Sequence, residues 1–368
     1  MSEQGCFDKT AFLSPSGSQN EPWVQQILDH PQGKVVHIKT AWSRLDRIGC
    51  IRARATRFRM HYKIEPGLYA MGRPKASSPV LVSANYKLSF DILRRELSGM
   101  DVWLLVVDSD GINVWCAAGK GTFGTVEIIN RIRAVNLDRI VTHRRIILPQ
   151  LGAPGVHSHI IQKSTGFRVF FGPVRAGDIK AYVDRGFQAT RDMRTVRFTW
   201  QNRLELIPME LNPAFKKFGG PLLLLLAVFG LQPEGILFKS MGNPGIPFLG
   251  MGIASILIGA FLIPLFIPYI PFRSFAVKGA CVGTVLYAAG YPFIRTTLDA
   301  NFWLIASAYL FFPALISYLS LNFTGATTFT NLSGVNKELR IAIPIYIGAT
   351  SLAGLFIVIY KLTLWGKL

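Results

Sequence analysis

One cysteine lies at the centre of residues 113–120, whose sequence is Asn-Val-Trp-Cys-Ala-Ala-Gly-Lys. This segment predicts about two turns of helix, with Asn113 as the N-cap and Gly119 as the C-cap. The thiolate of Cys116 is a soft, strongly donating ligand, which suits a soft transition metal. The alternative is that Cys116 only packs, because free cysteine is among the most buried residue types.

The segment follows a predicted strand at 102–107 and a turn at 108–111. Ligands of α/β proteins bind outside the carboxyl ends of the strands, so a ligand site is expected here. The helix predicted from Thr125 directs the positive end of its dipole toward the intervening loop. The glycines that let this loop approach a ligand closely are Gly119, Gly121 and Gly124. Their Gly-x-Gly-x-x-Gly spacing does not favour an NAD site, because it follows a short helix rather than a strand.

Strand and helix patterns alternate from residue 78 to residue 185, as a parallel sheet requires. They predict an α/β Rossmann-like domain over residues 45–190. The loops at 149–152 and 172–174 both follow strands, so they are expected at the same edge of the sheet as the helix 113–120. The predicted strands are 80–82, 102–107, 145–148 and 167–171, and the predicted helices are 89–97, 125–133, 156–163 and 178–185.

The segments on either side of this domain have simpler patterns. Residues 1–44 are predicted to be a polar lead with one strand candidate at 34–38, and residues 1–20 lack the apolar segment of a secretory signal peptide. Residues 191–217 are predicted to be a basic juxtamembrane linker, because six lysines and arginines precede the first apolar run.

Apolar residues concentrate in the last part of the chain, in runs at 219–231, 245–271, 279–294, 302–321 and 341–360. These runs predict an all-α transmembrane domain of about five helices over residues 218–368, although the first run is short and the third is marginal. With five crossings, one side of the membrane carries ten basic residues, including Arg273 and Lys337, and the other side carries four. The positive-inside rule therefore predicts a multi-pass protein of the cytoplasmic membrane with its amino-terminal domain in the cytoplasm, where a thiol stays reduced.

The charge of the chain also favours a membrane over nucleic acid. The sequence has 40 Lys+Arg against 21 Asp+Glu, for a formal net charge of +19. A basic domain beside membrane segments is attracted to anionic headgroups on the cytoplasmic side, so no nucleic-acid partner is expected.

Neither the cysteines nor the histidines predict a metal cluster of their own. His157 and His159 are two residues apart, a spacing that directs them to different sides of a helix. The cysteines form no CxxC pair, so neither a zinc site nor an iron–sulfur cluster is predicted. The four cysteines are Cys6, Cys50, Cys116 and Cys281.

Residues 113–120 resemble, at every position, the cap-helix motif of the membrane-anchored corrinoid protein of bacterial and archaeal mercury methylation. In that family the helix lies beneath a cobalt corrinoid of the cobalamin type, and its cysteine is the lower axial ligand of the cobalt. The resemblance extends less specifically over about residues 45–360. It includes the segments 65–69, 83–91, 148–152, 171–175 and 322–325.

The resemblance implies corrinoid-dependent methyl transfer to inorganic Hg(II), giving methylmercury, with Cys116 as the catalytic residue and cobalt ligand. A thiolate under Co(III) would donate electron density through the cobalt, which favours departure of the methyl group with its bonding electrons. The methyl group is expected from a methylfolate or a methyl-donor methyltransferase. Return of the cobalt to Co(I) needs low-potential electrons, so a ferredoxin-like iron–sulfur protein is expected as the electron donor. No Asp-x-His-x-x-Gly sequence occurs, which leaves the lower face of the cobalt open to Cys116.

The residues expected to contact the corrinoid belong to the cap helix, the glycine loop and the two loops that follow later strands. Asn113 and Trp115 are expected to set and support the helix, and Lys120 and Thr122 to contact the side chains of the corrinoid. The full set is Asn113, Val114, Trp115, Ala117, Gly119, Lys120, Gly121, Thr122, Gly124, Gln150, Gly152 and Gly172.

Two other functions remain open. One is a corrinoid methyl carrier of one-carbon metabolism, similar to the corrinoid iron–sulfur protein of acetyl-CoA synthesis, although the apolar half and the missing cluster motif count against it. The other is a membrane anchor or transporter with a ligand-sensing domain. A basic run at 42–63, opposed only by Asp46, is typical of a solvated or lipid-facing surface. Alternatively, its arginines contact an acidic protein partner or the tail of the corrinoid.

Overall fold

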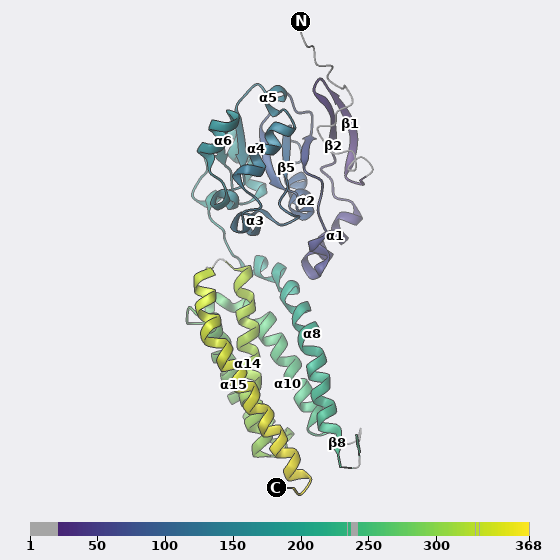
Figure 1. Ribbon diagram of the computed structural model, residues 1–368, viewed down its shortest axis with the longest axis vertical. Coiled ribbons are helices and arrows are strands. Elements are labelled where there is room, and N and C mark those ends of the chain that lie inside the picture. The colour runs from purple at the N-terminus through teal and green to yellow at the C-terminus, as the bar shows by residue number, and fades with distance from the viewer. Residues whose placement is uncertain (1–20, 234, 237–241, 328, 331, 368) are drawn as a thin grey trace. The chain divides into compact units, whose positions relative to one another are not determined.

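The computed structural model describes residues 21–367 except for 234, 237–241, 328 and 331. The chain divides into two compact units, Met1–Val196 and Arg197–Leu368. The first is a mixed α/β domain, and the second is helical apart from one short hairpin. Figure 1 shows the elements of both units.

The α/β unit is built on a seven-stranded sheet with the strand order β1-β2-β3-β5-β4-β6-β7. β4 pairs in parallel with both β5 and β6, and β6 pairs in parallel with β7. β1 pairs with β2, and β3 with β5, in antiparallel fashion, whereas β2 and β3 are parallel. The strands are β1 (Val24–His30), β2 (Gly33–Ile38), β3 (Gly67–Met71), β4 (Val80–Ala84), β5 (Val102–Val107), β6 (Arg145–Leu148) and β7 (Arg168–Phe171).

Helices cover both faces of this sheet (Figure 1). Ile128 and Ile132 of α4 and Ile161 of α6 pack on one face, and Phe90 of α2 and Tyr182 of α7 pack on the other. The helices are α1 (Arg44–Ala55), α2 (Lys87–Glu96), α3 (Val114–Lys120), α4 (Thr125–Ala134), α5 (Leu137–Ile140), α6 (Ser158–Thr165) and α7 (Ile179–Asp184). Short 3-10 turns are η2 (Arg57–Met60), η3 (Gln150–Gly155), η4 (Ala176–Asp178) and η5 (Asp192–Arg194).

The sheet differs from the predicted one in its first half. The predicted strands at 102–107 and 145–148 are confirmed to the residue, and β4 and β7 overlap their predictions. The sheet is mixed rather than parallel, because β3 was not predicted and runs antiparallel to β5. The strand candidate at 34–38 is confirmed as β2, but the rest of the described lead differs from the prediction, because β1 pairs with β2 and extends the sheet. β1 has mostly exposed side chains, so its sequence lacks the apolar run of a buried strand.

A buried group of charges joins α1 to α2. Asp91 lies 2.7 Å from Lys87 Nζ and 2.8 Å from Arg94 Nε, and Asp46 lies 2.6 Å from Arg94 Nη2. The hydroxyl of Tyr62 donates to Asp91 at 3.1 Å. Burial by itself raises the pKa of Asp46, but hydrogen bonds from Arg94 and from the N-cap of α1 outweigh it and lower that pKa to about 2. The buried carboxylates and cations of α1 and α2 therefore neutralise one another in a single network.

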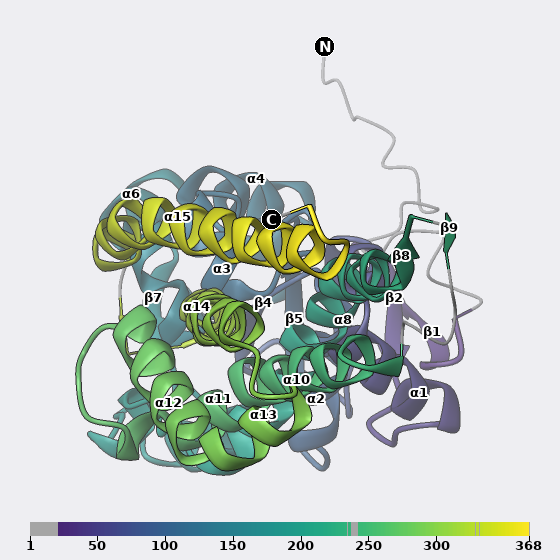
Figure 2. The same ribbon diagram turned by 90° about the horizontal axis from the view of Figure 1, so that it is seen from below.

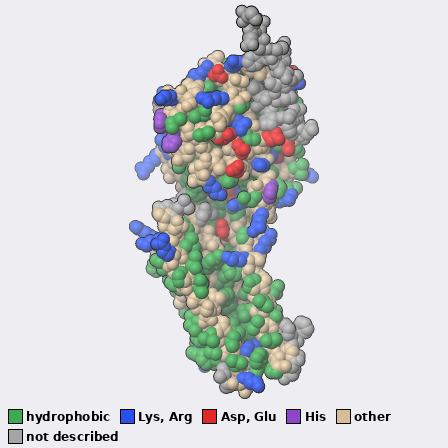
Figure 3. Space-filling view, viewed as in Figure 1, with side chains coloured by type: hydrophobic (Ala, Val, Ile, Leu, Met, Phe, Trp, Pro, Cys, Tyr) green, Lys and Arg blue, Asp and Glu red, His purple; other side chains and the backbone are tan. Residues whose placement is uncertain are grey.

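The helical unit consists of long apolar helices and several short ones. α14 lies among α10, α12 and α15 (Figure 2). Hydrophobic side chains cover much of the surface of this unit, and lysines and arginines gather toward its ends (Figure 3). Its elements are α8 (Trp200–Gly230), β8 (Leu231–Gln232), β9 (Gly235–Ile236), α10 (Gly245–Leu257), the π-helical η6 (Ile258–Leu262), α11 (Ile263–Phe266), η7 (Ile267–Tyr269), α12 (Phe275–Ala289), α13 (Tyr291–Thr297), α14 (Phe302–Asn322), η8 (Phe323–Ala326) and α15 (Leu332–Leu364).

Four helical segments of the described part are long and apolar enough to cross a bilayer. They are Trp200–Gly230, Gly245–Tyr269, Phe302–Asn322 and Ser333–Leu364. The third predicted run falls on α12 and α13, which are bent by 66° and raise the number to five if they count as one span. The predicted linker differs from the structure, because α8 begins at Trp200 and continues through most of it.

Three cations in this unit are buried and bound to backbone oxygens. Lys361 Nζ donates to Phe229 O at 2.7 Å, and Lys278 Nζ donates to Ile267 O at 2.8 Å. Arg203 binds two backbone oxygens in the same way. Because carbonyl groups at helix ends lack partners within the helix, Lys361 and Lys278 serve as C-caps of α8 and of the short helix η7.

Candidate cofactor site at the cap helix

The cap helix, α3, begins directly after the turn that follows β5. Asn113 Oδ1 accepts a hydrogen bond from Cys116 N at 3.0 Å, so the predicted N-cap is confirmed. The predicted C-cap at Gly119 is wrong, because the helix continues through Lys120 and ends at Gly121. Gly121 has φ 83°, a left-handed conformation that glycine adopts without strain.

The cap helix has an exposed face and a buried face. Cys116, Gly119 and Lys120 are exposed, and the thiol carries no disulfide. The alternative that Cys116 only packs is therefore wrong. Ala117 differs from its predicted role as a ligand contact, because its side chain is fully buried in the core beside the sheet. It anchors the helix from below and leaves the thiol on the outer side.

The turn η3 holds the cap helix in place through close backbone contacts. A Cβ atom on Gly155 would lie 3.1 Å from Ala118 Cα and 2.5 Å from Phe123 O. A Cβ atom on Gly152 would lie 2.6 Å from a ring carbon of Phe123. Gly152 therefore acts in packing, because only glycine lets η3 approach this closely.

A cavity of about 330 Å³ lies beside the cap helix at the carboxyl edge of the sheet. The loops after β6 and β7 meet the cap helix there, so the predicted convergence is confirmed. Its lining is mostly apolar and includes Val114, Trp115, Leu151, Gly172, Pro173 and Val174. Gln150 lies outside this lining, but its Oε1 is buried and has no hydrogen-bond partner in the described part of the chain.

The glycine loop connects the cap helix to α4. The hydroxyl of Thr122 donates to Ser109 O at 3.4 Å, so Thr122 braces the loop against the preceding turn. Gly124 belongs to a tight turn, because an added Cβ would lie 2.9 Å from Gly121 O. By contrast, apart from the chain neighbours and the backbone of the helix itself, no atom of the described residues lies within 4 Å of a Cβ built on Gly119 or Gly121. A flat ligand can therefore approach the backbone at these two glycines.

Asn85 is a positioning residue that the sequence analysis missed. It follows β4, and its buried Oδ1 accepts hydrogen bonds from Ser109 N at 3.0 Å, Ser109 Oγ at 2.8 Å and Gly111 N at 2.9 Å. Its Nδ2 donates to Asp108 Oδ1 at 2.9 Å. One side chain thus fixes the turn between β5 and the cap helix. The available signal was a polar residue placed directly after a buried strand.

Tyr86 was also missed as a member of this site. Burial is the main cause that raises the pKa of its hydroxyl, Arg59 and Arg54 lower that pKa, and Cys50 and Cys116 raise it. These electrostatic interactions mean that Tyr86 lies near both the arginines of the basic run and the thiol of the cap helix. Tyr86 also packs against Cys50 and Ala53 of α1, the helix that carries Arg54.

The histidines do not join this site. The rings of His157 and His159 are 6.1 Å apart. Among the described residues, no group of three or more His, Cys, Asp and Glu side chains is placed to hold a metal ion. In the described part of the chain, Cys116 is therefore the one exposed free thiol that a metal-bearing ligand could reach.

Replacing Asn85 with alanine is expected to lower stability by about 1–3 kcal/mol, because buried partners of the Asn85 amide lose their hydrogen bonds. It should also weaken cobalamin binding by about 10–100-fold, as loss of a residue that orients a metal ligand does. Thermal melts and equilibrium dialysis measure the two effects. Asn130→Ala, at an exposed position of α4, should change neither. Equal cobalamin affinities for Asn85→Ala and the unchanged protein would contradict the positioning role.

Residues 36–183, which lie within the α/β unit, match the family described as CO dehydrogenase/acetyl-CoA synthase delta subunit. The match fits the position of the site, because it contains the cap helix and both converging loops.

Several curated proteins are similar to about a third of the chain. One is the corrinoid/iron-sulfur protein large subunit of Moorella thermoacetica, 33% identical over 122 residues, which are 33% of this chain and 27% of that protein. Another is the acetyl-CoA decarbonylase/synthase complex subunit gamma of Archaeoglobus fulgidus, 28% identical over 127 residues, or 34% of this chain and 27% of that protein. The chain thus spans about a quarter of the length of these relatives.

Proposed function

We propose that this chain is a corrinoid-dependent methyl carrier in which Cys116 is the lower axial ligand of the cobalt. The observation that carries the proposal is the exposed thiol on a capped helix at the carboxyl edge of the sheet. The similarity to a corrinoid/iron-sulfur protein and to acetyl-CoA synthase subunits supports it, because the family match includes this helix. The carrier function in one-carbon chemistry has the stronger support from these relatives.

The donor set around the cap helix fits a corrinoid. The Cys116 thiolate is a soft donor, and open space above Gly119 and Gly121 leaves room for a flat ring. The cavity beside Trp115 would take an apolar part of the molecule, and the buried Gln150 Oε1 would accept a hydrogen bond from a carboxamide. When bound, the corrinoid supplies the cobalt that carries the methyl group. Cys116 would donate electron density to this metal, and the Asn113 cap and the Ala117 anchor hold the thiol in position.

The second candidate names Hg(II) as the methyl acceptor. The sequence of the cap helix favours it, because residues 113–120 resemble the motif of mercury methylation at every position. A strongly donating thiolate favours transfer of the methyl group with its electron pair, which an electron-poor, soft acceptor needs. In this reading the protein is a corrinoid-dependent methyltransferase that forms methylmercury.

The proposed cycle requires partner proteins. A ferredoxin-like iron–sulfur protein would supply electrons, because the sequence has no CxxC pair for a cluster of its own. A methylfolate, or the methyltransferase that carries it, would supply the methyl group. Two relatives are named as subunits of a complex, which supports protein partners. The arginines of α1 and η2 would offer a surface for an acidic electron donor.

The helical unit is proposed to span the cytoplasmic membrane, with the α/β unit in the cytoplasm. Its four long apolar helices support this location. The excess of basic residues on one side of the predicted spans supports the orientation.

Corrinoid binding and methyl transfer test the proposal with the full-length protein in detergent. We expect about one cobalamin per chain after reconstitution, as one exposed thiol site predicts. We also expect methylmercury when protein loaded with a methylated corrinoid meets Hg(II). A folded protein that binds no corrinoid would refute the carrier function. Binding without methylmercury formation would refute only the second candidate and leave the carrier of one-carbon metabolism.

A further inference from the structure

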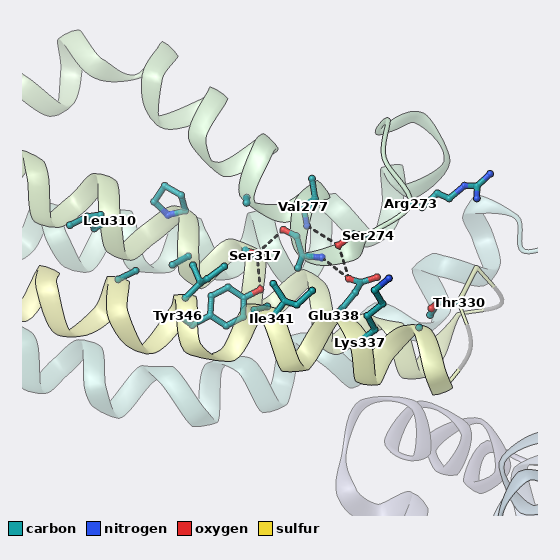
Figure 4. A pocket seen from close by; sticks show the side chains of 18 of the residues that line it. Arg273, Ser274, Val277, Leu310, Ser317, Thr330, Lys337, Glu338, Ile341 and Tyr346 are labelled. Carbon is teal, nitrogen blue, oxygen red and sulfur yellow. Dashed lines mark hydrogen bonds between the residues drawn. The ribbon is translucent and has the colours of Figure 1, made fainter.

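A second cavity, of about 720 Å³, lies in the helical unit and is separate from the cap-helix site. It is formed by α12, α14 and α15 (Figure 4). Its volume is within the range of about 300–1,000 Å³ that ligand pockets occupy. Nothing in the proposed methyl transfer uses this cavity.

Most of this cavity is hydrocarbon. Leu310, Pro313 and Ala314 of α14 face Ile341 and Ile345 of α15 across it. Five side chains with hydroxyl groups also line it. Tyr309 donates to Tyr287 O at 2.7 Å, Ser274 donates to Glu338, and two others bind each other. The hydroxyls of Ser317 and Tyr346 are 2.8 Å apart, and Ser317 Oγ donates to Ala276 O at 2.7 Å. The interior therefore suits an apolar chain rather than a polar molecule.

One end of the cavity is charged. Arg273 and Lys337 lie at this end, opposite Leu310 (Figure 4). Glu338 lies there too, but its carboxylate accepts hydrogen bonds from Ser274 Oγ at 2.9 Å and Ala276 N at 3.1 Å. It thus binds the first residues of α12. Two cations and one acid leave this end with a positive charge.

The two cations of this end differ from the buried cations of the same unit. Arg203, Lys278 and Lys361 are bound to backbone oxygens. Within the described part of the chain, Arg273 and Lys337 make neither an ion pair nor a hydrogen bond. The Arg273 side chain extends away from the apolar part of the cavity (Figure 4). These two groups are therefore available to a charged ligand.

We propose that this cavity binds one anionic phospholipid, with an acyl chain among α12, α14 and α15 and its phosphate against Arg273 and Lys337. Basic pockets between membrane helices on the cytoplasmic side bind anionic headgroups, and Arg273 offers the planar fork that matches a phosphate. Only 11% of the most apolar stretch of α15 is buried inside the protein. A bound lipid would add contacts where this helix has few. The proposal rests on membrane insertion and does not depend on the corrinoid.

An uncharged amphiphile such as a quinone is a weaker fit. It would leave both cations without a counter-ion, and the inward hydroxyls that could bind its carbonyl groups are already paired. Free phosphate would leave the apolar part of the cavity empty. The anionic phospholipid is the one occupant that uses both ends.

Native mass spectrometry of the full-length protein in a nonionic detergent tests this proposal. Phosphatidylglycerol and phosphatidylcholine of equal chain length are added separately, and the bound fraction is titrated. We expect tighter binding of phosphatidylglycerol. The double substitution Arg273→Gln and Lys337→Gln should weaken it by about 25-fold, from about fivefold for each cationic contact. The matched control, Arg295→Gln with Lys367→Gln, should leave the affinity unchanged. Ala314→Phe, which fills the apolar part, should weaken the binding of both lipids.

Equal affinity for the two lipids, or an unchanged affinity in the Arg273 and Lys337 variant, would overturn the proposal. Competition by glycerol 3-phosphate at the lipid's own concentration would identify a free phosphate site instead. Co-purification of a quinone in place of phospholipid would identify the uncharged ligand. Carbonate extraction of membranes tests insertion separately. Measuring cobalamin binding by the same variants distinguishes a failure of the lipid proposal from a failure of the methyl carrier proposal.

Discussion

Replacing Cys116 with alanine is expected to remove the cobalt–thiolate absorption and to lower methyl transfer by at least about 100-fold. This is the upper end of the loss seen when only a supporting residue of a metal site is removed. The thiol is exposed, and the α3 backbone is held by the Asn113 cap and by Ala117 in the core. The substitution should therefore remove the ligand and leave the helix in place. Visible spectra of cobalamin-loaded protein and single-turnover methyl transfer measure the two losses.

Cys281→Ala is the matched control, because it removes a free thiol from α12 in the other unit. It should leave both the spectrum and the transfer rate unchanged. Cys116→Ser offers an oxygen donor of similar size and should bind corrinoid without the thiolate absorption. An unchanged spectrum in Cys116→Ala would eliminate Cys116 as the cobalt ligand. A changed spectrum with full methyl transfer would mean that the ligand is dispensable for the reaction.

The sequence predicted those strands of the sheet that carry their own apolar signal. β5 is a continuous apolar run, β6 has three buried apolar residues after Arg145, and both were located to the residue. β1 has the adjacent, exposed polar residues Gln25 and Gln26, and it forms because β2 supplies its partner. β3 has five residues and pairs with β5, although β4 lies between them in the sequence. Its antiparallel pairing depends on long-range contacts that local periodicity does not contain.

The candidate site was predicted in part, because only some of its determinants are local. Asn113 caps its own helix, so its role was visible in the sequence. Gly119 and Gly121 were equally plausible ends for the helix, and only the backbone shows that Gly121 adopts the positive φ. Asn85 acts on Ser109 and Gly111, which are 24 and 26 residues away, so no short motif predicts its role. The corrinoid contacts of Lys120 stay a prediction.

The helical unit shows the limit of local rules for proline. Pro208, Pro213 and Pro221 all lie within α8, although proline removes a backbone donor from a helix. The apolar runs predicted where the long helices lie, but the beginning of α8 at Trp200 was not predicted. Thr199 caps it by accepting a hydrogen bond from Asn202 N at 3.4 Å. The helix therefore begins at its cap rather than at the first apolar residue.

Replacing Asp91 with alanine is expected to destabilise the α/β unit by about 3–5 kcal/mol, because it leaves buried charge without its partner. Asp91 is fully buried and binds both Lys87 Nζ and Arg94 Nε. Asp46 alone would then face two cations. Thermal melts of the full-length protein in detergent measure the loss, and hydrogen exchange of α1 should rise together with it, since Asp46 belongs to that helix.

Glu96→Ala is the matched control on the same helix. Glu96 pairs with Arg95 at 2.6 Å, but 51% of the Arg95 side chain is exposed, so removing the pair should cost less than about 1 kcal/mol. Asp91→Asn keeps the side-chain volume and one hydrogen-bond acceptor. Its loss of stability should therefore lie between those of the two alanine variants. If the Asp91→Ala and Glu96→Ala variants have the same melting temperature, the buried charges do not hold α1 on α2. If Asp91→Ala has the lower melting temperature but the amides of α1 stay protected from hydrogen exchange, the network stabilises α2 alone. Other contacts then position the arginines of α1.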